Sequence, residues 1–370
     1  MPVLNLGHTL RTDMTALRQE LAELRRPGPR VRICAMTSIA VLGSVLLALA
    51  LHLDSPWWAG ISGYMCTQAS EASSVQKGVL RCVGTIAGAV LGFLITPLVA
   101  YDHVAGVLAL FCIAFVASLC SLLSAHSYAW LLLGITSNLV ALASMTEPLR
   151  AFDIAAHRVL EVIVGTSFAM IVAIMFGADA GAGAPASPPG WSDLFERNWP
   201  AVSHAMRTAT TIALLPVIWS TFDLPGLGQT AITAAAVMAV PTVTGRFEED
   251  FSVVLHRGLL RLLGCLFGGV AGLILLALPL TDFLPWLALL GAGVWIAAHV
   301  QASARGVGYV GIQAGVVFIM TLVQGQQPPA SLIPAITRLA GIAGGLSILL
   351  LVTVATWPDA EPPPALPRQT

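Results

Sequence analysis

Charged residues are scarce in this chain, since Asp, Glu, Lys and Arg together make up only 10% of its 370 residues. A soluble globular domain carries about 25% of such residues. Hydrophobic residues make up 56% of the chain, and its mean hydropathy is +0.83. This composition excludes an ordinary soluble domain and predicts a protein embedded in a lipid bilayer, with no nucleic acid among its partners.

Motifs of catalysis are also missing from the sequence. No Walker A sequence, nucleophile elbow, dinucleotide fingerprint or metal cluster falls on a suitable element. The cysteines all lie in apolar segments without the spacing of metal ligands: Cys34, Cys66, Cys82, Cys112, Cys120 and Cys265. We therefore expect a protein that is not an enzyme and that holds neither a cofactor nor a metal.

Long apolar runs fill the sequence instead, and a membrane-spanning helix needs about 20 such residues. A first set of six runs covers residues 33–51, 57–69, 79–99, 104–122, 127–146 and 154–177. A second set of six covers residues 203–222, 227–243, 255–278, 284–300, 306–323 and 335–357. The pattern predicts an all-α polytopic membrane protein with about 12 transmembrane helices, arranged as two parallel six-helix repeats.

Polar and Gly/Ala/Pro-rich stretches divide the chain around these runs. The linker contains GADAGAGAPASPPG, which has no residues that could form a core. In residues 9–26, leucines lie on one helical face and charges on the other, which indicates a membrane-surface anchor or a partner-binding regulatory helix. The predicted segments are a cytoplasmic amphipathic segment 1–30, a first repeat 31–178, a cytoplasmic linker 179–200, a second repeat 201–357 and a cytoplasmic tail 358–370.

Basic residues predict the orientation of the chain in the membrane. With the N-terminus inside, the cytoplasmic side collects Lys77 and fourteen arginines, whereas the opposite side collects only Arg150, Arg158 and Arg338. Such an excess on one side is the positive-inside signal. We expect both termini in the cytoplasm and the protein in the bacterial inner membrane.

One string of the sequence occurs twice, 180 residues apart. Residues 76–92 read QKGVLRCVGTIAGAVLG, and residues 256–272 read HRGLLRLLGCLFGGVAG. Arg81 aligns with Arg261, each one turn before glycines that recur every four residues. Small residues at this spacing let two helices approach closely. We predict helix packing by Gly84, Gly88, Gly92, Gly264, Gly268 and Gly272.

Apolar runs two and eight are short or broken, and each lies just before the repeated helix. Broken membrane helices are tolerated where they line a protein cavity, and such pairs point to transporter sites. An arginine there binds a carboxylate through two parallel hydrogen bonds, so we expect a small organic anion as substrate. A purely structural role for the arginines stays open. The predicted substrate-binding residues are Arg81, Arg261, Gln68, Thr67, Ser70 and Thr242.

A second group of ionisable residues predicts proton coupling or gating. Glu161 lies three residues after Arg158, so the two can pair on one helix face. The alternative interpretation is an ion pair that only stabilises the helix. We add Glu71, which lies in the polar stretch where the second apolar run ends, and Arg338, which lies near the start of the twelfth run.

These residues resemble a known family. Trp57, Trp58, Gln68 and the pattern Arg81, Gly84, Thr85 and Gly88 are similar to the fusaric acid resistance and aromatic acid exporter family, over roughly residues 30–357. The second copy departs from this pattern, with Cys265 in place of the threonine and no leading tryptophan pair. Many relatives carry a sizeable cytosolic domain after each six-helix unit, whereas this chain has only a short linker and tail.

The resemblance implies proton-gradient-driven export of aromatic or other weak organic acids, often with a periplasmic membrane-fusion protein as partner. Plant organic-anion channels with a similar six-helix unit form dimers. A passive anion channel and a homodimer are therefore further expectations. A non-transporting membrane scaffold in envelope assembly is the third hypothesis.

Overall fold

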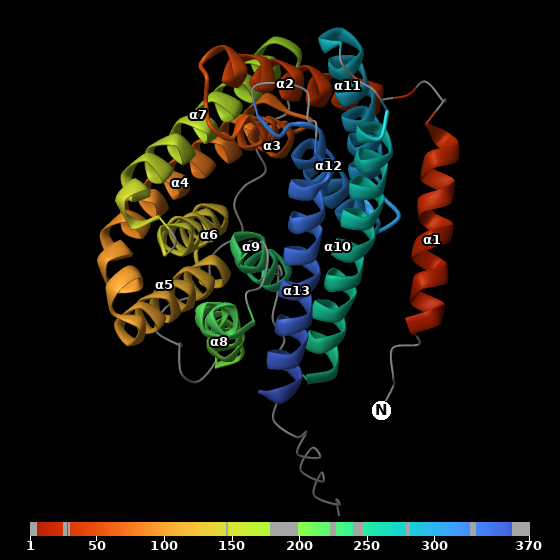
Figure 1. The fold of residues 1–370 in the computed structure, drawn as a ribbon. Coiled ribbons are helices and arrows are strands. Elements are labelled where there is room, and N and C mark those ends of the chain that lie inside the picture. The colour runs from red at the N-terminus through yellow and green to blue at the C-terminus, as the bar shows by residue number, and fades with distance from the viewer. Residues whose placement is uncertain are drawn as a thin grey trace, which may run out of the picture.

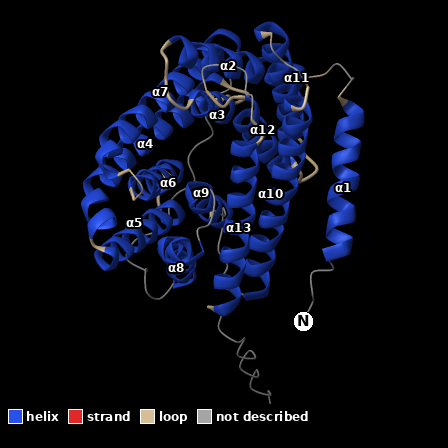
Figure 2. Cartoon of the chain, viewed as in Figure 1, coloured by secondary structure: helices blue, strands red, loops and turns tan. Residues whose placement is uncertain are grey.

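The computed structural model describes residues 6–24, 28, 30–145, 147–177, 199–222, 227–239, 247–278, 282–325 and 331–356. Within these residues the regular elements are helices (Figure 2). Nearly all of the predicted linker, and the whole predicted tail, lie outside the described residues.

The chain begins with an N-terminal helix and continues through two groups of helices (Figure 1). The first part consists of α1 (Leu6–Glu23), α2 (Arg30–Ala50), α3 (Pro56–Cys66), α4 (Glu71–Tyr101), α5 (His103–Leu123), α6 (Ser127–Ser144), the 3-10 helix η1 (Pro148–Arg150) and α7 (Ala151–Phe176). The second consists of α8 (Trp199–Phe222), α9 (Leu227–Met238), α10 (Phe247–Leu276), α11 (Phe283–Gln301), α12 (Gly308–Leu322) and α13 (Ile333–Ala355). We call α2–α7 the first unit and α8–α13 the second unit.

Several of these helices suit a membrane by length and composition. In the described part of the chain, eight are long and apolar enough to cross a bilayer: α2, α4, α5, α6, α7, α8, α10 and α11. Two further apolar stretches, Gly308–Leu322 and Leu339–Ala355, are shorter. The chain is therefore an all-α, multi-pass membrane protein, and the count of twelve spans stays a prediction.

The helix α3 is a half-length helix with defined ends. Its 11 residues reach about 16 Å, roughly half of the hydrocarbon core. Pro56 at its start suits a first turn, where a backbone N–H has no helical partner anyway. The chain turns extended at Thr67, and Ser70 then caps α4 by accepting a hydrogen bond from the Ser73 N–H at 3.3 Å. The polar string after Cys66 is thus the junction between two helices.

The helix α4 packs against α6 along its glycine face, and α10 packs against α12 in the same way. A Cβ atom added at Gly88 would lie 2.6 Å from the carbonyl oxygen of Leu133. One added at Gly264 would lie 2.5 Å from the carbonyl oxygen of Val310. Because only a residue without Cβ permits this approach, the glycines determine how closely each pair of helices packs.

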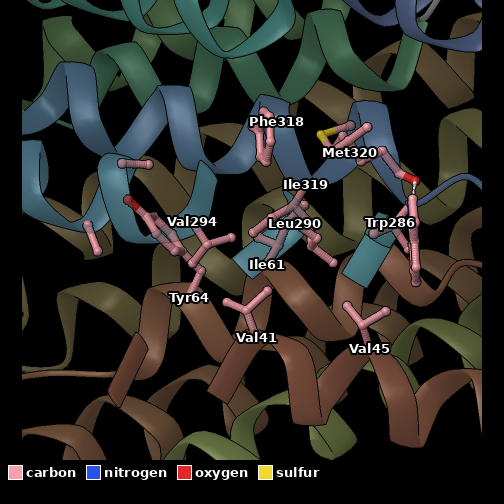
Figure 3. Packing of buried hydrophobic residues seen from close by; sticks show 14 of the residues in the cluster. Val41, Val45, Ile61, Tyr64, Trp286, Leu290, Val294, Phe318, Ile319 and Met320 are labelled. Carbon is pink, nitrogen blue, oxygen red and sulfur yellow. Dashed lines mark hydrogen bonds between the residues drawn. The ribbon is translucent and has the colours of Figure 1, made fainter. Parts of the chain in front are cut away.

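The two units contact each other through α2 with α11, α3 with α12, α5 with α8 and α6 with α9. An apolar cluster fills the junction of α2, α3, α11 and α12 (Figure 3). Tyr64 from α3 is buried there, and its hydroxyl donates to the carbonyl of Gly311 at 3.0 Å. Trp286 from α11 donates its indole N–H to the carbonyl of Leu322 at 3.0 Å (Figure 3). Close packing therefore joins the units at this junction.

The helix α1 stands beside the second unit (Figure 1) and contacts α11. Leu17 packs into an apolar cluster of that unit with Leu260, Val300, Val307 and Val310. The helix α1 overlaps the predicted amphipathic segment, and of its apolar residues Leu17 is buried against protein, whereas Met14 and Leu21 are exposed.

A buried carboxylate also holds α1 in place. Glu20 is fully buried and accepts hydrogen bonds from Arg30, from Arg305 and, at 2.7 Å, from Ser303. Burial alone would raise the pKa of this carboxyl, but these donors lower the pKa below its usual value. Since Arg30 begins α2 and Arg305 follows α11, Glu20 links the two units.

Candidate functional site

The first unit contains a buried arginine. Arg81 on α4 is 4% exposed. Its Nε donates to the hydroxyl of Ser62 at 3.1 Å, and its Nη1 donates to the hydroxyl of Tyr128 at 2.8 Å. Both partners are neutral, and no ion pair of the described residues includes this guanidinium. Its positive charge is therefore solvated by hydroxyl groups alone.

The second unit contains a similar arrangement around Arg261 on α10, which is 5% exposed. One terminal nitrogen donates to the side-chain oxygen of Gln313 at 2.6 Å, and the other donates to the hydroxyl of Thr233 at 3.2 Å. Its Nε has no hydrogen-bond partner. Among the described residues, a second buried guanidinium thus has only neutral hydrogen-bond partners.

A second cation precedes each arginine by one turn and lies over an aromatic ring. The ammonium of Lys77 is 5.4 Å from the centroid of the Tyr128 ring. The guanidinium of Arg257 is 4.4 Å from the centroid of the Tyr309 ring. Such contacts stabilise a cation without neutralising it. Each unit therefore combines two positive charges with a tyrosine, which is a suitable environment for an anion.

An ion pair on α7 lies against the first turn of α3. Arg158 on α7 donates to the carboxylate of Glu161 at 3.2 Å, and that carboxylate also accepts from the backbone N–H of Ser55 at 2.8 Å. The Arg158 guanidinium is 4.1 Å from the centroid of the Trp58 ring. Since Trp58 and Ser62 are one turn apart on α3, this pair and Arg81 border consecutive turns of the same short helix.

Three of the residues predicted to bind substrate, Thr67, Gln68 and Ser70, make hydrogen bonds at the junction of α3 and α4, and their role in binding stays a prediction. Thr67 donates its hydroxyl to the carbonyl of Gly63 at 2.8 Å. Gln68 donates its side-chain amide to the carbonyl of Thr67 at 2.8 Å, and Ser70 caps α4. Glu71 lies in the first turn of α4. The structure therefore brings Arg81 together with Ser62 and Tyr128, and not with residues 67–71.

Two other predicted residues cannot be placed. Thr242 lies outside the described residues. Arg338 belongs to α13, but its side chain is outside the described part. Conversely, sequence reasoning missed Ser62, Tyr128, Thr233 and Gln313, because their contacts with the arginines join separate helices.

Comparison with known proteins supports the family resemblance in the first unit. Residues 31–186 match the model of the fusaric acid resistance protein family. A p-hydroxybenzoic acid efflux pump subunit, AaeB, from Escherichia coli O9:H4 is 23% identical over 160 residues, which are 40% of this chain and 24% of that protein. The uncharacterized transporter YdhK of Escherichia coli K12 is 29% identical over 143 residues, which are 36% of this chain and 21% of that protein.

A further AaeB, from Enterobacter cloacae, is 24% identical over 160 residues, again 40% of this chain and 24% of that protein. The chain thus matches less than a quarter of the length of these relatives. No solved structure matches it. The region matched by the family contains α2–α7, and with them Arg81, Arg158 and Glu161. Over residues 31–186 the chain is therefore similar to the fusaric acid resistance protein family, as its sequence pattern predicts.

Proposed function

We propose that the protein is a secondary membrane transporter that exports small aromatic carboxylic acids, driven by the proton gradient. The observation that carries this proposal is the pair Arg81 and Arg261, two buried cations with neutral partners. A buried charge without a counter-ion is unfavourable, so a bound anion would stabilise it. A guanidinium also suits a carboxylate, because its fork of N–H groups matches the two carboxylate oxygens.

The proposed architecture has twelve spans in two parallel six-helix repeats, 31–178 and 201–357, related by a pseudo-two-fold axis along the membrane normal. This proposal is supported by helix contacts that recur in both units. The contact of α4 with α6 corresponds to that of α10 with α12, and the contact of α2 with α11 corresponds to that of α8 with α5. The excess of basic residues on one side supports cytoplasmic termini. Inner-membrane localisation is part of the same proposal.

The substrate class rests on relatives of which this chain matches only a part. One is a subunit of a p-hydroxybenzoic acid efflux pump and another is a transporter by name. The word subunit supports a partner protein, and we propose a periplasmic membrane-fusion protein in that role. A homodimer belongs to the same proposal, in which one dimer offers four arginine sites.

Glu161 is the proposed proton carrier, with Arg158 as its partner. The carboxylate is 1% exposed and is held by one guanidinium and one backbone N–H. Proton binding to Glu161 would release Arg158 from the pair, which offers a means to couple protonation to anion movement near α3. The second candidate function is a passive anion channel, in which the same arginines attract the anion and Glu161 only orders Arg158.

The test measures efflux of radiolabelled 4-hydroxybenzoate from proteoliposomes, with and without a pH gradient. Arg81→Gln and Arg261→Gln should each lower the flux at least tenfold, because each removes a buried positive charge. Arg150→Gln is the control, since its side chain is 58% exposed and pairs at the surface. Unchanged flux in both arginine variants would overturn the proposal. Flux that ignores the gradient selects the channel. A parent protein that carries no flux, and whose partner binding is lost in the arginine variants, selects the non-transporting scaffold.

A further inference from the structure

Titratable side chains gather at the start of α7, between the solution and the buried Glu161. The side chain of Asp54, in the connection before α3, is 55% exposed, and that of His157 on α7 is 36% exposed. The carboxylate of Asp54 lies 3.7 Å from Nδ1 of His157 and 3.8 Å from a terminal nitrogen of Arg150. This cluster therefore reaches from the solution to the turn of α7 that precedes Glu161.

The contacts of His157 show which of its ring nitrogens can exchange a proton. Nδ1 is 2.9 Å from the backbone carbonyl oxygen of Asp153. A carbonyl oxygen only accepts hydrogen bonds, so Nδ1 carries a hydrogen and donates it to this bond. Nε2 is then the atom that gains a proton when the ring becomes charged. An imidazole ordinarily makes this change near neutral pH, which suits it to the transfer of protons.

Glu161 lies within reach of this cluster. His157 and Glu161 are four residues apart on α7, so they share a helix face, with about 5–6 Å between their Cβ atoms. The carboxylate of Glu161 also accepts the backbone N–H of Ser55 at 2.8 Å, directly after Asp54. A single water molecule can bridge polar groups at such a separation. Because Glu161 is only 1% exposed, a partly exposed neighbour offers the shortest path for a proton from the solution.

Charged groups on the neighbouring elements surround the imidazole and the carboxylate. Asp54 stabilises a charged imidazole, and Arg158 stabilises the ionised carboxylate of Glu161 at 3.2 Å. Arg150 in η1 lies against Asp54, and the like charge of Arg81 on α4 acts on Arg158. A charged imidazole and an ionised carboxylate are the two groups present just before a proton is passed on. The cluster thus stabilises both of them.

The second unit does not repeat this pair of groups. Gly165 and Gly345 align α7 with α13, because an added Cβ atom would meet the backbone of α3 in the first case and that of α9 in the second. Residues 157–161, HRVLE, therefore align with residues 337–341, TRLAG. The arginine is present in both stretches, whereas the histidine and the glutamate occur in the first alone. Since the glycines that pack the helices are repeated, the unrepeated pair indicates a task of the first unit alone.

We propose that His157 is the relay that passes protons between the solution and Glu161, and that Asp54 orients and stabilises its charged ring. The neutral imidazole takes a proton from the solution on Nε2. It then gives a proton, through a bridging water, to the carboxylate of Glu161, which becomes a carboxylic acid while the imidazole returns to its neutral form. This path rests on the proposed role of Glu161 as proton carrier. Its entrance is the N-terminal end of α7, which the proposed topology puts opposite the cytoplasm.

The test follows the protonation of Glu161 after a rapid drop in pH, by time-resolved infrared spectroscopy of the protein in lipid nanodiscs. The carboxylic acid of Glu161 gives a carbonyl band that Glu161→Gln lacks. In His157→Ala this band should rise at least about tenfold more slowly, and added imidazole should restore the rate. His157→Asn keeps a donor for the Asp153 carbonyl without a titratable ring, and it should be equally slow. His103→Ala is the matched control, because His103 is an exposed histidine at the start of α5, and it should keep the parent's rate.

The outcomes separate the relay from the proposed function. An unchanged rate in both His157 variants, or a slow rate in His157→Ala that imidazole does not restore, would overturn the relay; gradient-driven efflux would then leave the proposed function standing. A slow, imidazole-restored rate together with efflux that ignores the gradient supports the relay and removes the proposed function. A parent protein without the Glu161 band would overturn both the relay and Glu161 as proton carrier. Should His157→Ala not fold, the rate in His157→Asn decides.

Discussion

Glu161 and Arg158 depend on each other, because Glu161 is buried, Arg158 is only 12% exposed, and each carries a charge that the other offsets. In Glu161→Gln the amide oxygen can still accept from the Ser55 N–H, so the local fold is retained while the titratable group is lost. We expect substrate flux in proteoliposomes with a pH gradient to fall to the level measured without one. Loss of one partner of a buried pair also destabilises a fold by about 3–5 kcal/mol, so a lowered melting temperature should accompany this change.

Glu147 provides the matched control for that experiment. It pairs with Arg150 at 2.9 Å, but its side chain is 52% exposed. Exposed pairs of this kind contribute about 0–1 kcal/mol, so Glu147→Gln should keep both the gradient response and the melting temperature. If Glu161→Gln keeps its gradient response too, the carboxylate only stabilises the helix, which is the alternative that the sequence left open.

The sequence predicted that Arg81 lies one turn before the glycine face of its helix, but it did not predict the hydrogen-bond partners of Arg81. Arg81 lies one turn from Gly84, and a periodic small-residue face is a local signal that survives without tertiary information. Its partners Ser62 and Tyr128 belong to other helices, and a single serine or tyrosine has no period. Thr67 and Gln68 stay predicted substrate-binding residues, although both hydrogen-bond the backbone at the end of α3. Polar residues at a helix break often make such bonds, so the sequence alone does not separate the two roles.

At the scale of the helix, the close contact between the glycine face of α4 and the helix α6 predicts that an added methyl group destabilises the fold. Gly88→Ala adds a Cβ that would meet the carbonyl oxygen of Leu133 at 2.6 Å, so α4 and α6 must move apart. Overpacking of this kind costs about 1–3 kcal/mol, and we expect a lower melting temperature in detergent. In Gly344→Ala, on α13, nothing lies within 4 Å of the added atom.

Gly344→Ala is therefore the control, and its melting temperature should not fall. Alanine is the better helix former by about 1 kcal/mol, so this variant should melt at the parent's temperature or above it. Equal melting temperatures for Gly88→Ala and the parent protein would mean that α4 and α6 have room to adjust, contrary to the observed approach.

For the whole molecule, the sequence predicted two related units but not how they differ. The repeated string aligns at a constant offset, so Arg81 and Arg261 correspond by inspection. Arg81 contacts Ser62 on α3, and Arg261 contacts Thr233 on α9. Tyr64 and Ala235, each two residues further along, therefore correspond. The offset between α3 and α9 differs from the offset of the repeated string, so the sequence does not show this correspondence. The junction of α2, α3, α11 and α12 and that of α5, α6, α8 and α9 therefore look unrelated until the helices are packed.

The helix α1 joins the two units through the carboxylate of Glu20. Because this carboxylate can be protonated, we expect the docking of α1 to depend on pH. Burial raises the pKa of Glu20, but donation from Ser303, Arg305 and Arg30 prevails and holds it below the usual 4.5. Because the pKa of Glu20 is lower in the folded state, its carboxylate stabilises the docked α1 fully above about pH 4.5. This stabilisation is lost as the pH falls through the lowered pKa of the folded state. His299 and Glu23 are the other titratable groups in contact with these side chains.

Glu20→Gln should thus release α1 at neutral pH, as acidification releases it in the parent protein. We expect amide hydrogen exchange in residues 6–23, corrected for intrinsic rates, to rise at least tenfold, a change of about 1.4 kcal/mol. Glu23→Gln is the control on the same helix, because Glu23 is 31% exposed and pairs with Arg305 at the surface. Since only Glu20 links Arg30 of α2 with Arg305 after α11 among the described residues, its loss should also lower the melting temperature of the assembled units. Unchanged exchange in Glu20→Gln would show that the apolar contact of Leu17 alone holds the helix.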